Sequence, residues 1–133
     1  MPNMEVTNVD LGSVVYRAPE FRDELITFAG AATLKEGTIL ARDTATDKMV
    51  IFVKGGTTNG NGVPNAVLTY EVEAAGAGDV AARPALGGVF VKERLVIHAD
   101  GDDSEVDAAV LDGLRQVGIR AVNVAELGKQ DNQ

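Results

Sequence analysis

Acidic side chains gather in one short stretch in the last third of the chain. Asp100, Asp102, Asp103 and Glu105 fall within residues 100–105, and carboxylate oxygens are the ligands that calcium and magnesium prefer. The stretch lacks the alternating carboxylates and the distal glutamate of an EF-hand loop. The same charges also suit the start of a helix, where the backbone dipole attracts anions. Helix capping explains them without a metal, so we assign no metal ligand.

Other candidates for catalysis are weak. His98 is the only histidine, the chain has no cysteine, and no serine lies in a Gly-x-Ser-x-Gly turn, so no nucleophile paired with a base is evident. The glycine-rich loop at residues 55–62 lacks the Gly-Lys-Ser/Thr run of a phosphate-binding loop. The 20 acidic residues show no spacing that selects a catalytic pair. We therefore expect a structural role for His98, no enzymatic activity and no cofactor.

Composition limits the class of protein and its partners. The chain has 133 residues, 45% hydrophobic and 5% aromatic, which suits one domain with an aliphatic core. Its net charge of −8 repels phosphate backbones, so we expect no nucleic acid partner. No apolar run is long enough to cross a bilayer, so we expect no membrane partner. The first residues lack the basic and apolar blocks of a secretory signal, which favours an intracellular protein.

Short strands and glycine-rich turns are predicted for most of the chain. Runs of β-branched and apolar residues predict strands at residues 25–28, 38–42, 49–54, 67–72, 86–91, 94–98 and 119–124. Short polar side chains at residues 43–48 favour a tight turn between the second and third of these strands. Gly37 is expected to need a positive φ or a close backbone approach. Gly87 and Gly88 suggest a bulge at the start of their strand.

One helix is predicted between Ser104 and Gly118. Ser104 is the candidate N-cap, with Asp107 three residues later in a pattern close to a capping box. Gly118 is expected to end the helix, with Ile119 as the apolar residue that follows such a stop. The apolar face at helical spacing consists of Val106, Ala109, Val110, Leu114 and Val117.

Residues 1–22 carry few periodic signals, yet they contain more apolar residues than a solvated tail needs. We expect an extended arm that becomes ordered only against a partner, because ordering costs about 1–2 kcal/mol per residue. A disordered tail is the alternative. A β-rich domain then covers residues 23–127, followed by a polar tail at 128–133. The candidate contact residues of the arm are Val6, Val9, Leu11, Val14, Val15 and Tyr16.

These elements predict a β-rich α+β fold. It would be a small barrel or sandwich of short strands, with one packed helix near the C-terminus and an extended N-terminal arm. Such a small aliphatic core is only marginally stable alone, which makes an oligomer plausible.

Several pieces of the sequence, in this order, resemble the head decoration proteins of lambda-like phages. The resemblance covers roughly residues 24–122. Where that family usually has Ala-Gly-Ile-Leu, this chain has Asn65-Ala66-Val67-Leu68 and so lacks the glycine. The matching pieces are Gly37-Thr38-Ile39-Leu40, Asp43-Thr44-Ala45-Thr46, Ala66-Val67-Leu68, Gly88-Val89-Phe90, Leu95 and Leu114-Arg115-Gln116-Val117-Gly118-Ile119.

The resemblance implies a trimeric, non-enzymatic protein that stabilises a phage head. Such a protein binds the major capsid protein at local three-fold sites after the shell expands, on the outer surface of the virion, and is made in the host cytoplasm. The arm would then lie on the capsid and add a strand to an exposed edge. Two other hypotheses remain: a small β-barrel module that binds a soluble ligand or partner protein at its glycine loops, and a hydrolase that uses a divalent ion at residues 100–105.

Overall fold

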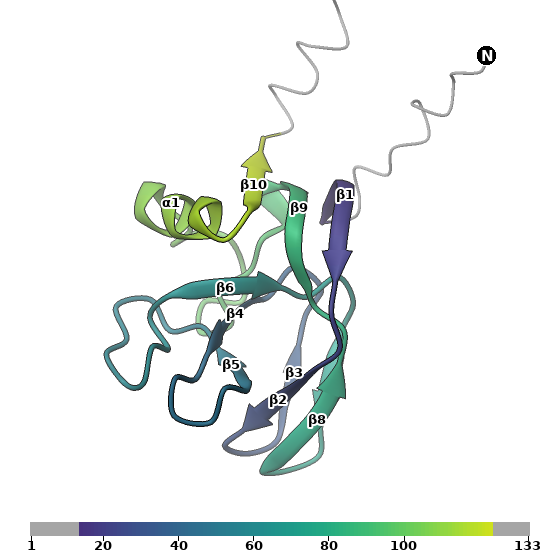
Figure 1. Ribbon diagram of the computed structural model, residues 1–133, viewed down its shortest axis with the longest axis vertical. Helices are drawn as coiled ribbons and strands as arrows, with labels where there is room; N and C mark the ends of the chain where they lie inside the picture. The colour runs from purple at the N-terminus through teal and green to yellow at the C-terminus, as the bar shows by residue number, and fades with distance from the viewer. Residues whose placement is uncertain (1–13, 124–133) are drawn as a thin grey trace, which may run out of the picture.

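The computed structural model describes residues 14–123, and they form a β-rich domain with one α-helix among them (Figure 1). This confirms the predicted fold class. Eight strands form one curled sheet in the order β1-β9-β6-β4-β5-β2-β8, with β10 beside β9, while β3 and β7 form a two-stranded sheet. The elements are β1 (Val15–Phe21), β2 (Glu24–Phe28), β3 (Ala32–Leu34), β4 (Ile39–Arg42), β5 (Met49–Ile51), β6 (Pro64–Val67), β7 (Val72–Ala74), β8 (Gly78–Ala82), β9 (Ala85–Val91), the 3-10 helix η2 (Lys92–Arg94), α1 (Ala108–Gln116) and β10 (Ile119–Val122).

The predicted hairpin in the centre of the sheet is present. β4 and β5 pair antiparallel, with Leu40 opposite Ile51. In the turn between them, Asp43 Oδ1 accepts hydrogen bonds from the backbone N–H of Ala45 at 2.8 Å and of Thr46 at 3.2 Å. These bonds hold the turn in the way that short polar side chains do in an Asx turn.

Strand β4 separates two hydrophobic clusters. Ile39 and Ala41 belong to one cluster together with residues of β9 and α1, whereas Leu40 belongs to the other with residues of β2, β3 and β5. Successive side chains of a strand point to opposite faces, so a four-residue strand contributes to both cores. Most of the buried residues are aliphatic, as the composition predicts.

Gly37 has both properties expected of it. Its φ is +94°, and a Cβ at this position would collide with the carbonyl oxygen of Arg94. Its N–H donates to the carbonyl of Leu68 at 2.7 Å, and its own carbonyl accepts from the N–H of Val96 at 2.8 Å. Gly37 therefore lets three segments of backbone meet at one point.

The helix begins later than predicted. Asp107 is the N-cap, and its side chain accepts a hydrogen bond from the N–H of Val110 at 3.1 Å. Ser104 lies in the preceding turn, where its N–H donates to Asp102 Oδ1 at 2.9 Å. Asp107 also pairs with Lys54 Nζ at 2.8 Å, and this ammonium lowers the pKa of Asp107. Val106, Val110 and Leu114 are buried and Val117 is half-buried, whereas Ala109 is exposed, contrary to prediction.

The helix ends as predicted. Gly118 has a φ of +91°, and Ile119 beyond it is fully buried. The chain then enters β10, which pairs parallel to β9 over residues 119–122. Residue 124, the last of the predicted strand, and the predicted tail at 128–133 lie outside the described residues.

Two strand predictions were wrong. The segment predicted as one strand at 67–72 is divided, because the backbone of Leu68 bonds to Gly37 and Thr38 and redirects the chain. As a result β6 pairs with β4, while β7 pairs with β3 in the other sheet. β8 was not predicted, because its small residues give no strand signal; a five-residue ladder with β2 holds it. The predicted strand at 94–98 makes only isolated bridges.

The C-terminal part of the predicted arm belongs to the sheet. β1 pairs antiparallel with β9, and the chain bulges where Ala18, at φ +54°, faces Gly88. Gly88 allows this approach because a Cβ there would lie 2.9 Å from the Ala18 carbonyl oxygen. The predicted bulge is thus present: the extra residue lies on β1 at the first two register shifts, and on β9, between Ala85 and Gly87, at the third. Residues 1–13 lie outside the described part of the chain.

Candidate functional site

The six residues predicted to contact a partner fall into two groups. Val6, Val9 and Leu11 lie outside the described residues. Val14 is fully buried, and Val15 and Tyr16 are half-buried on β1. Val14 is anchored through its backbone, since its N–H donates to Glu36 Oε2 at 3.1 Å and its carbonyl accepts from Val91 N–H at 2.8 Å. Val14 thus fixes the start of the folded domain, and its buried side chain is not available to a partner.

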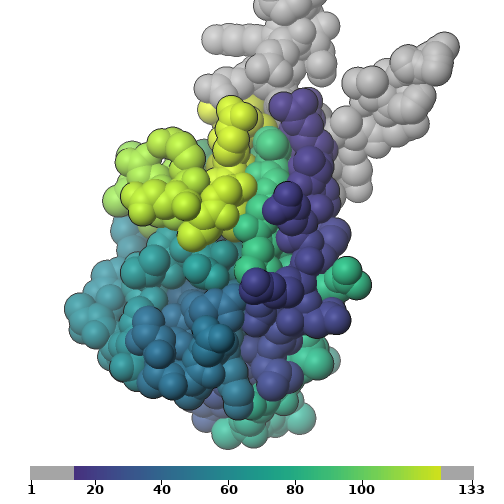
Figure 2. Space-filling model, in the orientation of Figure 1, coloured from purple at the N-terminus to yellow at the C-terminus, as the bar shows by residue number. Residues whose placement is uncertain are grey.

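Both ends of the described chain emerge at the same end of the sheet. β1 is antiparallel to β9 and places Val15 opposite Phe90, whereas β10 is parallel to β9 and places Val122 opposite Val91. β1, β9 and β10 lie side by side there (Figure 2). Any segment attached to either end therefore starts from one small region of the surface.

β1 is an edge strand of the sheet, because it stands at the end of the strand order. Its exposed side chains are two charged and two apolar ones, Arg17, Glu20, Ala18 and Phe21. The guanidinium of Arg17 lies 5.7 Å from the ring centre of Tyr16. Edge strands offer unpaired backbone groups to another chain. β1 therefore has a free edge, which is interrupted by the bulge at Ala18 and by Pro19, a residue without an N–H to donate.

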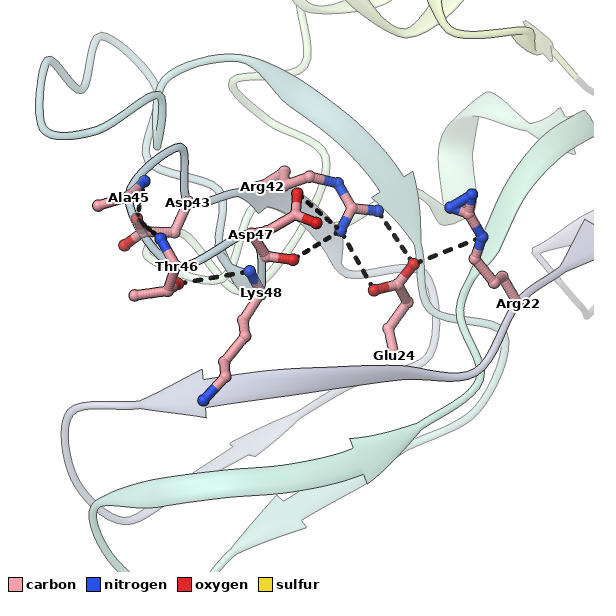
Figure 3. Close-up of polar contacts among 8 residues, drawn as sticks. All are labelled: Arg22, Glu24, Arg42, Asp43, Ala45, Thr46, Asp47 and Lys48. Atoms are coloured by element: carbon pink, nitrogen blue, oxygen red, sulfur yellow. Dashed lines mark hydrogen bonds and ion pairs between the residues drawn. The ribbon is translucent and has the colours of Figure 1, made fainter.

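A charged network joins the start of β2 to the end of β4 and the β4–β5 turn. Arg42 donates to both carboxylate oxygens of Glu24, at 3.2 and 3.0 Å, and to the carbonyl of Asp47 at 2.9 Å (Figure 3). Arg22 lies 3.7 Å from the same carboxylate. The hydrogen bond with Glu24 raises the pKa of Arg42. The Glu24 side chain is only 9% exposed, so this pair is shielded from water.

We expect Arg42→Ala to lower the free energy of unfolding by about 2 kcal/mol, because it leaves the shielded Glu24 carboxylate without its main partner. Urea denaturation measures the change. Arg115→Ala is the matched control: its pair with Asp112 is 66% and 60% exposed, and the expected loss is below about 0.5 kcal/mol. Adding Glu24→Gln to the Arg42→Ala variant should lower the free energy of unfolding little further. If the two substitutions cause equal losses that simply add, Glu24 and Arg42 do not stabilise the fold as a pair.

The acidic stretch at residues 100–105 is largely engaged by the protein itself. Asp102 accepts from the Ser104 N–H, and hydrogen bonding by Ser104 lowers the pKa of Asp102. Glu105 pairs with Lys54 at 3.1 Å, and Asp103 lies 4.0 Å from Lys92. Within residues 14–123, no three histidine, cysteine or acidic side chains are grouped as metal ligands. Of the described helices, none has the length and apolar character required to cross a membrane.

An open groove of about 630 Å³ lies beside the charged network. Tyr70 and Leu25 are each more than 40% exposed there. The Tyr70 hydroxyl accepts a hydrogen bond from the backbone N–H of Arg83 at 2.7 Å. The side-chain guanidinium of Arg83 lies 5.9 Å from the ring centre of Phe21. His98 lies elsewhere and is half-buried. The lining residues are Asp23, Glu24, Leu25, Asp47, Lys48, Tyr70, Ala81, Ala82 and Arg83.

Comparison with known proteins identifies the family to which the chain belongs. No curated protein matches the chain. The family model for bacteriophage lambda head decoration protein D matches residues 7–119, which is most of the chain and includes part of the predicted arm. The predicted resemblance is confirmed, and this chain belongs to the bacteriophage lambda head decoration protein D family.

Proposed function

We propose that this protein is a cement that binds the expanded phage head as a trimer at local three-fold sites. The family match carries this proposal. Membership of the family supports a capsid decoration role, a place in the virion and binding to the capsid, and the family is structural, not enzymatic. The proposal adds that the partner is the major capsid protein on the outer surface of the head. It also adds that the protein is made in the host cytoplasm and that it has no nucleic acid partner. The net charge of −8 favours the absence of a nucleic acid partner, because it repels phosphate groups.

Attachment is assigned to residues 1–13, with Val6, Val9 and Leu11 as apolar contacts. Two observations support this assignment: the arm starts next to Val14, which is fixed to the sheet, and β1 is an edge strand. An arm that pairs with a capsid strand gains main-chain hydrogen bonds and buries valines, which offset an ordering cost of about 1–2 kcal/mol per residue. Three arms on one trimer bind together, so weak single contacts give firm attachment.

The proposal is tested by mixing the purified protein with expanded heads and pelleting the heads. We expect co-sedimentation in a molar ratio of one to the major capsid protein, and heads that resist a higher temperature, because a ligand of the intact lattice stabilises it by mass action. Light scattering on the free protein checks the trimer. Absence from the pellet would refute the cement function, whereas binding by a monomer would refute only the trimer.

One observation, the open groove beside Tyr70, favours a second function. A binding module would use this groove for a soluble ligand, since concave surfaces with exposed apolar side chains are common ligand sites. A protein that stays monomeric and does not bind heads, but loses ligand binding on Tyr70→Ala, would favour this function over cement.

A further inference from the structure

Two Asn-Gly pairs lie in the loop at residues 55–62. Asn59 and Gly60 both have positive φ, +48° and +82°, and Asn61 N–H donates to the carbonyl of Thr58 at 3.0 Å. This is the arrangement of a type I′ turn. The carbonyl of Asn59 also accepts from the N–H of Thr44 at 2.9 Å, which ties the loop to the β4–β5 turn.

The two asparagines differ in how their side chains are held. Asn59 is exposed, and within the described residues its carboxamide has no hydrogen-bond partner. Asn61 is half-buried, and its Oδ1 accepts from the N–H of Thr58 at 3.1 Å. The same oxygen packs against Gly56, where a Cβ would collide with it. The carboxamide of Asn61 is therefore fixed, while that of Asn59 is free to rotate.

We propose that Asn59 is a site of spontaneous deamidation and that the fold protects Asn61 from the same reaction. The Gly60 amide nitrogen gives its proton to solvent base and attacks Cγ of Asn59. A C–N bond forms, the carboxamide nitrogen leaves as ammonia, and a succinimide ring results. Water then opens the ring to aspartate or isoaspartate, with no change in oxidation state. Glycine favours the attack because it has no Cβ to obstruct the nitrogen.

The reaction changes both charge and backbone at this loop. Either product adds one negative charge. Isoaspartate also adds a methylene to the main chain at Asn59, which displaces the carbonyl that accepts from Thr44 and the turn bond between Thr58 and Asn61. The contact between this loop and the β4–β5 turn should therefore weaken in molecules that have reacted.

The test compares native and urea-unfolded protein. The full chain is incubated under both conditions at mildly alkaline pH, digested, and analysed by tandem mass spectrometry, whose fragments separate residue 59 from residue 61. In the native protein we expect Asn59 to react about fivefold faster than Asn61. This factor corresponds to the free energy of one hydrogen bond, because the bond between Thr58 N–H and Asn61 Oδ1 must break before Asn61 reacts. In urea the two rates should converge. Equal native rates, a faster Asn61, or no reaction at Asn59 would overturn the proposal.

A variant tests the protection directly. Gly56→Ala pushes the Asn61 carboxamide away from Thr58, because the new Cβ takes the place of Oδ1. Native deamidation at Asn61 should rise towards the rate at Asn59, and the rate at Asn59 should not change. Gly76→Ala is the control, since no atom lies within 4 Å of its Cβ position. If the Gly56 variant folds and Asn61 stays protected, the side-chain restraint is not the cause.

Discussion

Removing residues 1–13 should reduce binding to expanded heads on the order of 100-fold or more, because three arms contribute together to attachment. The folded domain should be unaffected, since Val14 and β1 remain in place. Co-sedimentation measures the binding and urea denaturation measures the stability. Binding equal to that of the full chain would refute the arm as the attachment segment.

The matched control is a longer deletion of residues 1–21. It also removes β1 and the buried Val14, so it should lower the free energy of unfolding by about 2 kcal/mol or more. The shorter deletion should show no such loss. If both deletions destabilise the protein equally, residues 1–13 contribute to the fold, and a loss of head binding could not be assigned to direct contact.

Gly37→Ala should be among the most damaging single substitutions in the domain. Alanine is strained at the observed φ of +94°, and its Cβ would collide with the Arg94 carbonyl oxygen, which is fixed backbone. We expect a loss of about 3–5 kcal/mol in the free energy of unfolding. Thermal and urea denaturation monitored by circular dichroism give the value.

Two other glycines separate the causes of that loss. Gly55 has a φ of +78° but open space at its Cβ position, so Gly55→Ala should cost only the conformational strain, about 1–2 kcal/mol. Gly30 has neither a positive φ nor a nearby atom, so Gly30→Ala should change stability by less than about 0.5 kcal/mol. A Gly37 variant no less stable than the Gly55 variant would show that the backbone at Arg94 can move.

Local signals predicted the parts of the fold that local interactions determine. The β4–β5 turn follows from Asp43, which bonds to the N–H groups just after it, and the helix stop follows from Gly118. The N-cap was misplaced because Ser104 and Asp107 are both good caps, and local signals do not show that Asp107 also pairs with Lys54, far away in the sequence. β8 was missed because its strand character comes from pairing with β2, and its own residues are small.

The candidate site could be predicted only in part. The family resemblance gave the capsid role, and the clustering of valines gave the arm. The sequence could not show that the arm's last residues join the sheet, because β1 is stabilised by its pairing with β9. No local spacing connects Glu24 with Arg42, so their shielded pair was missed; acidic and basic residues near strand ends are too common to indicate it.

The pairing of β1 with β9 also determines how the domain would respond to tension. If residues 1–13 bind the expanded shell as proposed, tension in the shell pulls on the chain ahead of Val14, and that force runs along β1. All the ladder bonds to β9 then carry the load in shear instead of peeling one after another. The kink at Ala18 against Gly88 should raise the force needed to separate the two strands, because β1 must straighten before it can slide along β9.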